Sequence, residues 1–258
     1  MTIMHDASAW LSHEMRMEVT GFTSLRAMHT VGSLRKSAGG PTRTVTSLCQ
    51  GLGRLGVEVD LISQTWFDSA GDSDLIPPPD FVRTIMVPAH RLPGVGEAWA
   101  PGYKALLNQR CGRPGAQLIH DHGLWLPTNH AAARVAHRQG IPLIVSPRGM
   151  LEPWAVNHRV WKKRLAWFSY QRRDLQTARV LHATAPKEAV NLRRLGLTQP
   201  IAVIPNGIDL PAGVEPRRWT GGRRVALFLS RIHPVKGLLN LVDAWAMARP
   251  AGWRVLIA

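Results

Sequence analysis

The sequence predicts an α/β protein built on a doubly wound parallel sheet, and three observations lead to this fold class. From residue 25 onward, short β-branched or apolar runs alternate with segments of helical period. The alternation pauses at 206–222, a stretch rich in Gly and Pro, and restarts at 224. The hydrophobic share of 45% allows a sizeable core. We therefore expect a Rossmann-like first domain and the first β-α-β part of a second one.

The individual elements follow from the period of the apolar residues. The expected strands of the first domain are 26–31, 57–63, 81–87, 117–122, 142–146, 179–184 and 201–205. The first helix is expected to begin at Pro41 and to stop at Gly56. The other helices are expected at 98–110, 128–138, 157–178 and 186–195. After the pause we expect strand 224–230, helix 237–248 and strand 253–258.

These elements divide the chain into a tail (1–24), an N-terminal domain (25–209), a linker (210–222) and the beginning of a C-terminal domain (223–258). The tail carries charged residues among its apolar ones, which a signal peptide would not. No stretch approaches the ~20 apolar residues of a spanning helix. Two cysteines cannot form a disulfide framework, and no CxxC spacing suggests zinc. We expect a cytoplasmic protein.

The net charge of +15 predicts attraction to an anionic partner. No nucleic-acid-binding motif accompanies the charge, so we expect no nucleic-acid partner. Residues 157–179 hold seven basic residues and one acidic residue, which gives +6 of the total.

Within this segment Trp161, Leu165 and Phe168 share one helical stripe. A basic helix with aromatic residues fits the surface of an anionic membrane, on its cytoplasmic side. The alternative is a stripe buried in the core beneath a solvated basic face. The candidate membrane-surface residues are Arg159, Lys162, Lys163, Arg164, Arg172 and Arg173.

Four post-strand segments carry candidate ligand-binding residues, because ligands of open parallel sheets bind beyond the carboxyl ends of the strands. Gly39 and Gly40 precede a helix whose free N–H groups suit an anion; an ordinary turn is the alternative. In the segment 120–125 (HDHGLW), strand alternation places His120 and His122 on one face. They could hydrogen-bond a sugar or be merely structural. A third metal ligand is not evident, so we expect no metal.

Cationic side chains follow two further strands. Arg148 can bind a phosphate or a carboxylate through its guanidinium; the alternative is a structural ion pair with Glu152. Arg231 and Lys236, in the segment 230–237 (SRIHPVKG), emerge from one strand-to-helix loop, where two cations could stabilise a leaving diphosphate. Surface charge is the alternative for this pair.

Taken together, the GGP loop, HDHGLW, SPRGMLEPW (146–154), IPNGID (204–209) and SRIHPVKG occur in the order seen in glycosyltransferases of family 4. The chain resembles this family over roughly residues 25–258, most closely its bacterial members that build exopolysaccharide or lipopolysaccharide. The resemblance implies a GT-B fold of two Rossmann-like domains, a nucleotide-sugar donor and a glycan or lipid-linked acceptor. It implies retention of anomeric configuration, with the leaving phosphate accepting the acceptor's proton, and no cofactor or metal.

The resemblance also assigns roles to residues. Arg231 and Lys236 match the cations on the donor diphosphate, and His122 matches the cleft histidine; these three form the catalytic set. The substrate-binding set comprises Gly39, Gly40, Arg148, Glu152, Asn206 and Gly207. The family's paired glutamates have no counterpart in this sequence, so we expect a chain truncated in the C-terminal domain that binds donor weakly and turns over slowly or not at all. A non-catalytic membrane-surface or acceptor-binding module is the alternative function.

Overall fold

The structure is a computed structural model of the 258-residue chain. It describes residues 25–66, 74–91, 98–112, 114–157, 160–209, 213, 221–222, 224–230 and 232–258. The expected tail, most of the expected linker, Arg159 and Arg231 lie outside the described residues. The chain divides into two compact units, Met1–Gly207 and Ile208–Ala258, and each is described by itself.

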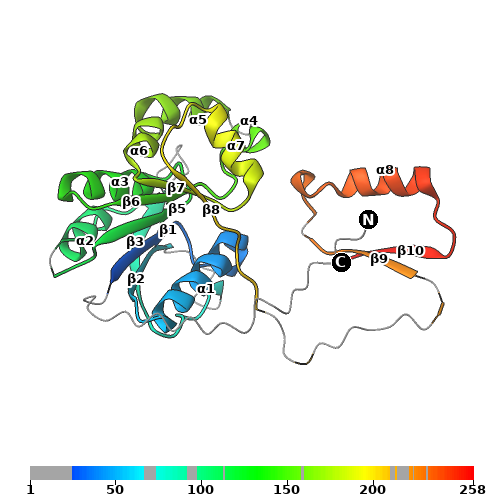
Figure 1. Cartoon of the computed structure of the whole chain (residues 1–258), viewed down its shortest axis with the longest axis horizontal. Coiled ribbons are helices and arrows are strands. Elements are labelled where there is room, and N and C mark those ends of the chain that lie inside the picture. The colour runs from blue at the N-terminus through cyan, green and yellow to red at the C-terminus, as the bar shows by residue number, and fades with distance from the viewer. Residues whose placement is uncertain are drawn as a thin grey trace, which may run out of the picture. The chain divides into compact units, whose positions relative to one another are not determined.

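The first unit is built on one eight-stranded sheet with the order β4-β3-β2-β1-β5-β6-β7-β8 (Figure 1). Seven neighbouring strands run parallel, and β4 pairs antiparallel with β3 at one edge. The strands are β1 (Arg26–Val31), β2 (Glu58–Trp66), β3 (Val82–Arg91), β4 (Ala98–Trp99), β5 (Leu118–His122), β6 (Leu143–Ser146), β7 (Val180–Ala183) and β8 (Ile201–Val203). The predicted α/β class with a parallel sheet is confirmed.

Helices cover both faces of this sheet, and consecutive residues of the central strands β1 and β5 are therefore buried. On one face α1 (Gly40–Arg54) packs Val45 and Cys49 against Val31, Val59 and Leu61 of β1 and β2. On the other face, α2 (Tyr103–Arg110), α3 (Pro127–Gln139), α6 (Arg172–Thr177) and α7 (Pro186–Arg194) join one larger core cluster. Both cysteines are free, and Cys49 is buried in the smaller cluster.

Two expected helices differ from the structure. The predicted helix 98–110 was wrong at its start, because Ala98 and Trp99 pair with Arg91 and His90 as strand β4 and the helix begins only at Tyr103. The predicted helix 157–178 is helical without interruption over 160–177, but its winding changes inside. It consists there of α5 (Val160–Ala166), a π-helical turn (η4, Trp167–Gln171) and α6, and the short α4 (Pro153–Asn157) precedes it in sequence. A π-helical turn inserts one residue into the helical register and is often found at functional sites.

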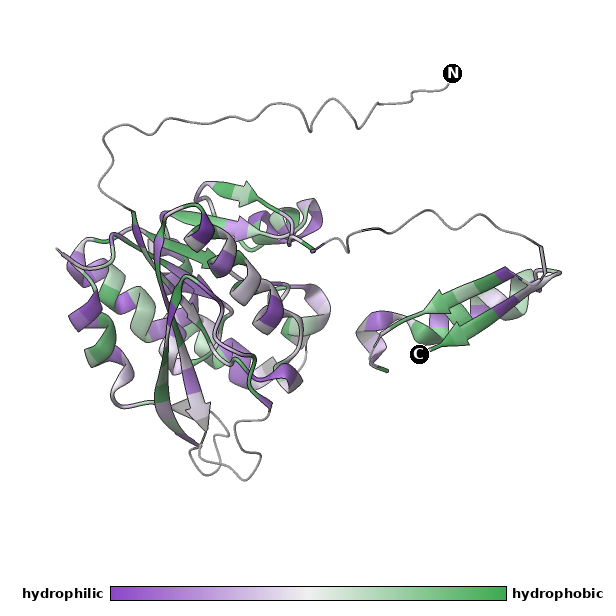
Figure 2. Cartoon of the chain, turned by 90° about the horizontal axis from the view of Figure 1, so that it is seen from below, coloured by the Kyte–Doolittle hydropathy of each residue, from purple (hydrophilic) through white to green (hydrophobic). Residues whose placement is uncertain are grey.

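The second unit contains β9 (Arg224–Phe228), a short 3-10 turn (η5, Pro234–Lys236), α8 (Leu238–Ala248) and β10 (Trp253–Ile257). The two strands pair in parallel, as a β-α-β connection requires. In Figure 2 the ribbons of both strands have the hydrophobic colour over most of their length. Several of their apolar side chains, among them Leu227 and Leu256, are exposed in the structure.

The order of the strands places a topological switch point between β1 and β5. From β1 the chain proceeds to β2 and β3 on one side, whereas β5 begins the run β5-β6-β7-β8 on the other. The loops that follow β1 and β5 therefore leave the sheet in opposite directions. A ligand crevice is expected at this place, outside the carboxyl ends of the strands.

Candidate functional site

Four histidines gather beside the switch point. His29 of β1 lies directly opposite His120 of β5, and His122 lies two residues further along the same strand and face. The ring centroids of His120 and His122 are 4.0 Å apart, and those of His29 and His120 are 5.0 Å apart. His182 of β7 extends the group, with its ring centroid 5.3 Å from that of His120. All four side chains are buried.

The guanidinium of Arg148 contacts this group and links β5, α1 and the segment after β8 by hydrogen bonds. Its Nε donates to Nδ1 of His122 at 3.2 Å. Its Nη1 donates to Oγ1 of Thr44 on α1 and to Oδ1 of Asn206 after β8, each at 2.9 Å. Arg148 has a φ of 51°, a left-handed conformation that is costly for a residue with a Cβ. Such strain persists only where surrounding contacts enforce it, and it is frequent at ligand sites.

The histidines form two chains of hydrogen bonds. Nδ1 of His29 lies 3.1 Å from Nε2 of His122. Nδ1 of His182 lies 3.3 Å from Nε2 of His120, and Nε2 of His182 lies 2.9 Å from the carbonyl oxygen of Ile204. Burial lowers the pKa of His29 to about 4, with the charge of Arg148 adding to the effect. Burial and neighbouring rings also lower the pKa of His120 and His122 well below 6.5, so these rings are neutral at pH 7.

The expectation that no third imidazole accompanies His120 and His122 was wrong. One nitrogen each of His29, His120 and His122 lie within 4.8 Å of one another, which three ligands of one metal ion could satisfy. The contact from Arg148 opposes such an ion, because a guanidinium is a permanent cation that only donates hydrogen bonds. The absence of a metal from the reaction stays a prediction.

The loop that carries Arg148 is held by a buried carboxylate rather than by an ion pair with Glu152. Oε1 of Glu188 accepts from the backbone N–H of Gly149 at 2.7 Å, and its Oε2 accepts from the N–H and the hydroxyl of Thr184. Glu152 instead accepts from Nδ2 of Asn191 at 2.8 Å. The alternative in which Arg148 pairs with Glu152 is therefore wrong, and Glu152 acts here as a support of the loop.

Replacing Glu188 by alanine is expected to lower the free energy of unfolding by about 2–3 kcal/mol, because two part-buried N–H groups lose the acceptor that a buried carboxylate supplies. Glu58→Ala is the matched control, since that carboxylate forms an ion pair with Arg26 in which both side chains are exposed. Its loss should cost less than about 1 kcal/mol. Urea denaturation of both variants measures the difference, and equal costs would contradict the role of Glu188.

The glycine loop lies at the start of α1, beside Thr44. Gly39 has a φ of 99°, which glycine adopts without strain, whereas a Cβ at Gly40 would meet no atom within 4 Å. Ser37, in the preceding 3-10 turn (η2, Lys36–Ala38), donates its hydroxyl to Oδ2 of Asp74. The glycine loop and Arg148 are brought together by the Thr44 contact. The N-terminus of α1, which favours anions, therefore lies next to a cation.

The segment after β5 is fixed by the π-helical turn. The backbone N–H of Trp125 donates to Oε1 of Gln171, and the hydroxyl of Tyr170 donates to the carbonyl of Trp125, both at 2.8 Å. Trp125 has a φ of 76°. On the other side of β5, Asp121 accepts from Thr30 at 2.6 Å and from Nδ2 of Asn129 at 2.9 Å. These bonds hold the ends of β5 and α3 in place beneath the histidines.

A sequence profile described as a glycosyl transferase 4-like domain matches residues 39–207, which is more than half of the chain. The chain belongs to this family. The matched range contains every described residue of the histidine and Arg148 site except His29. A search of curated proteins finds no match.

Solved structures similar to this member of the glycosyl transferase 4-like family share its fold at low identity. HepE of Anabaena, in complex with UDP and glucose, aligns with a TM-score of 0.60 and 15% identity over 90% of this chain and 60% of that one. Sucrose-phosphate synthase of Thermosynechococcus elongatus aligns with a TM-score of 0.56 and 17% identity over 90% and 62%. The chain thus spans about 60% of the length of these structures. The expected GT-B fold class is confirmed.

Some predicted site residues of this family member come together and others do not. His122, Arg148 and Asn206 are joined by hydrogen bonds, whereas Gly207 is exposed and a Cβ there would meet no atom within 4 Å. Lys236 is exposed in the second unit, and its predicted partner Arg231 lies outside the described residues.

Sequence reasoning missed His29, Thr44 and Glu188. His29 sits inside the first strand, where a buried histidine gives no motif. Glu188 is the third residue of α7, and its separation of four residues from Thr184 does not match the three-residue spacing of a capping box, so no local motif marked it.

The basic segment presents its apolar stripe to solvent. Trp161 is 69% exposed, Leu165 66% and Phe168 77%, so the alternative of a buried stripe is wrong. Arg164, Arg172 and Arg173 are exposed beside it, whereas Asp174 is buried and bonded to Nδ1 of His130. Among the helices of the described residues, none has the length and apolar character to cross a bilayer.

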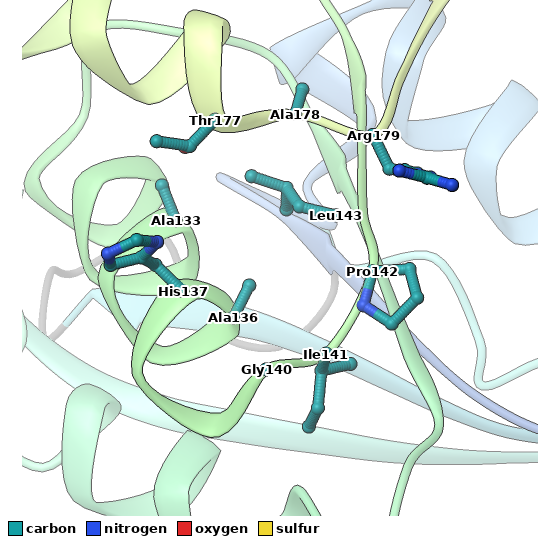
Figure 3. A pocket seen from close by; sticks show the side chains of 10 residues that line it. All are labelled: Ala133, Ala136, His137, Gly140, Ile141, Pro142, Leu143, Thr177, Ala178 and Arg179. Atoms are coloured by element: carbon teal, nitrogen blue, oxygen red, sulfur yellow. The ribbon is translucent and has the colours of Figure 1, made fainter.

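A pocket of about 510 Å³ lies at the amino ends of strands β6 and β7, opposite to the end that carries the histidines (Figure 3). It is lined by the end of α3, including His137 and Gly140, by the start of β6 and by Arg179 before β7. These are the amino ends of the strands, away from the histidines. Because ligands of this fold bind beyond the carboxyl ends, we do not include this pocket in the site.

Proposed function

We propose that this protein is a retaining glycosyltransferase that moves a sugar from a nucleotide-sugar donor to a glycan or lipid-linked acceptor in the synthesis of cell-surface polysaccharide. The observation that carries the proposal is the guanidinium of Arg148, held beside the glycine loop and the start of α1 by Thr44, His122 and Asn206. Membership of the glycosyl transferase 4-like family supports the reaction type. HepE, which has the same fold, was crystallised with UDP-glucose.

The chemistry of the site supports a phosphate-bearing substrate. A leaving diphosphate gains negative charge during glycosyl transfer, and preorganised donors stabilise that charge. Arg148 offers its positive charge and the donor Nη2, and α1 adds the partial positive charge of its N-terminus. Arg231 and Lys236 are proposed as the donor-side cations in the second unit. Retention is proposed to proceed by same-face attack, with the leaving phosphate accepting the proton of the acceptor.

The exposed stripe of α5 and η4 supports an acceptor at an anionic membrane surface. Aromatic and aliphatic side chains enter the interface, while flanking cations attract acidic lipids at about 1 kcal/mol each. Trp161 and Phe168 would insert, and Arg164, Arg172 and Arg173 would face the headgroups. We propose a peripheral location on the inner face of the cell membrane.

Replacing Trp161 and Phe168 together by serine is expected to weaken binding to anionic vesicles at least tenfold, since each large apolar side chain contributes about 2 kcal/mol when buried. Co-sedimentation with phosphatidylglycerol–phosphatidylcholine vesicles measures this. Vesicles of phosphatidylcholine alone should bind little. Leu55→Ser, which changes a side chain 82% exposed at the end of α1, is the matched control and should bind normally. Undiminished sedimentation of the double variant would refute the membrane surface.

Titration of the 258-residue chain with UDP, GDP, ADP and their sugars tests the donor. We expect saturable, weak binding of one nucleoside diphosphate and its sugar. The alternative function, a non-catalytic membrane-surface or acceptor-binding module, is favoured by the same exposed stripe. It predicts vesicle binding with no response to any nucleotide sugar, which would contradict the transferase proposal.

A further inference from the structure

The hydrogen bonds from Arg148 through His122 to His29 can run in only one direction. Arg148 has no acceptor atom, so its Nε must donate and Nδ1 of His122 must accept. A neutral imidazole carries one proton, which in His122 is therefore on Nε2. That N–H points to Nδ1 of His29 at 3.1 Å, so His29 accepts there and carries its own proton on Nε2.

The reverse direction is excluded by chemistry. If His29 donated to Nε2 of His122, both nitrogens of His122 would be unprotonated and the ring would be an imidazolate anion. Burial disfavours such an anion, because it penalises the charged form of a group. Burial and neighbouring charges lower the pKa of His122 well below 6.5, which keeps the ring neutral rather than cationic at pH 7. His29 and His122 are 1% and 2% exposed, so water does not substitute for either partner.

The second chain of histidines anchors the segment that also holds Arg148. A carbonyl oxygen only accepts, so Nε2 of His182 donates to Ile204, and Nδ1 of His182 lies 3.3 Å from Nε2 of His120. Ile204 stands two residues before Asn206, which accepts from Nη1 of Arg148. The Nε of Arg148 is thus held by His122, which is bonded to His29. Its Nη1 is held by Asn206, in the segment that His182 anchors at Ile204. No described residue accepts a hydrogen bond from Nη2 of Arg148, which leaves that amine for a ligand.

We infer that His29 is a positioning residue, which accepts the Nε2 proton of His122 and thereby fixes the tautomer whose Nδ1 holds Arg148 in its anion-binding orientation. The identity of the anion as the phosphate of a nucleotide sugar rests on the proposed function. The tautomers of His29 and His122 depend only on hydrogen bonds within the first unit.

The same contacts change the role assigned to His122. The sequence places it in the catalytic set, yet both of its ring nitrogens are engaged inside the protein. It has no lone pair left for the proton of an acceptor hydroxyl while Arg148 is in place. His122 therefore acts through Arg148, and its role in the reaction is positioning rather than proton transfer.

Two substitutions of His29 separate positioning from folding. In His29→Asn the side-chain oxygen stands near the place of Nδ1 and can still accept from His122. In His29→Leu the volume is kept and the acceptor is lost. Nitrogen-15 NMR of the histidine rings, assigned with a His122→Asn sample, reports the tautomer, and solvent exchange of the Arg148 Nε–H reports the orientation of the guanidinium. His137→Asn, an exposed position on α3, is the control.

We expect wild-type His122 to carry its proton on Nε2 and to keep it there in His29→Asn. In His29→Leu the other tautomer should appear, with Arg148 Nε–H exchange at least tenfold faster. A wild-type ring protonated on Nδ1 would overturn the inference. Unchanged spectra in a folded His29→Leu protein, or equal damage from both substitutions, would overturn it as well.

Binding of UDP adds a functional readout that stands apart from the spectra. Loss of one buried hydrogen bond predicts an affinity about three- to tenfold weaker in His29→Leu and within about twofold of wild type in His29→Asn. Failure of wild-type protein to bind any nucleotide would count against the proposed function and leave the NMR test intact. Normal UDP affinity in a folded His29→Leu protein would overturn the link from His29 to the anion site.

Discussion

Arg148→Ala is expected to weaken binding of the nucleotide-sugar diphosphate roughly 10- to 100-fold, which corresponds to one charged hydrogen-bonding group at about 1.5–3 kcal/mol. The substitution removes the donors to His122, Thr44 and Asn206 together with the charge beside α1. Glu188 still holds the N–H of the adjacent Gly149, so the backbone of the loop keeps its support. The change in affinity therefore reports the guanidinium rather than the backbone. Calorimetric titration measures it.

Two controls make this result specific. Arg148→Lys keeps the charge but cannot donate from Nε and Nη1 at once, so it should recover only part of the affinity. Arg138→Ala removes an exposed arginine from α3 and should bind as wild type does. A folded Arg148→Ala protein with unaltered affinity would remove the observation on which the proposed function rests.

The general fold could be read from the sequence because its signals are local. The run 26–31 is β1 to the residue, and Pro41 and Gly56 bracket α1 closely, since proline, glycine and apolar period act over a few neighbours. Strand β4 was missed because two residues carry no period, and its pairing with His90 and Arg91 is a tertiary contact. The π-helical turn inside the basic helix was missed for the same reason: Tyr170 and Gln171 of η4 are hydrogen-bonded to the backbone of Trp125.

The site was predictable only where a residue stands in a motif. Arg148 and Asn206 follow strands in recognisable segments, and the structure joins them directly. His29 belongs to a strand on the other side of the switch point, 93 residues from its partner His122, and nothing in the neighbouring sequence marks it. Periodicity places a side chain on a face, but it does not say which side chains of separate strands meet. That requires the strand order and the register.

Acidification from pH 7 to pH 5 is expected to destabilise the first unit through its buried histidines. Burial lowers the pKa of His29 from 6.5 to about 4, and it lowers those of His120 and His122 in the same direction. The unfolded chain therefore binds protons on these imidazoles that the folded chain does not. For His29 the stabilisation is complete above about pH 6.5 and is lost as the pH falls toward 4, by about 2 kcal/mol at pH 5.

Two buried carboxyls act in the opposite sense. Burial raises the pKa of Asp121 from 3.8 to about 7, despite hydrogen bonds from Thr30 and Asn129 that favour the ionised form. Burial also raises the pKa of Asp174, against the hydrogen bond with His130. The folded state then binds protons on these groups that the unfolded state does not, so they stabilise the protein as the pH falls below 7. They offset part of the loss that the three histidines cause.

Urea denaturation of wild type and of His29→Asn at pH 7 and pH 5 measures the balance. The variant lacks one of the three depressed imidazoles, so its loss of unfolding free energy between the two pH values should be smaller by about 2 kcal/mol, whatever its stability at pH 7. His137→Asn, which replaces an exposed histidine outside the cluster, is the control. A His29→Asn protein that loses as much unfolding free energy as wild type would mean that His29 accepts a proton in the folded protein. In that case His29 could not accept from His122, and the orientation of Arg148 would need another cause.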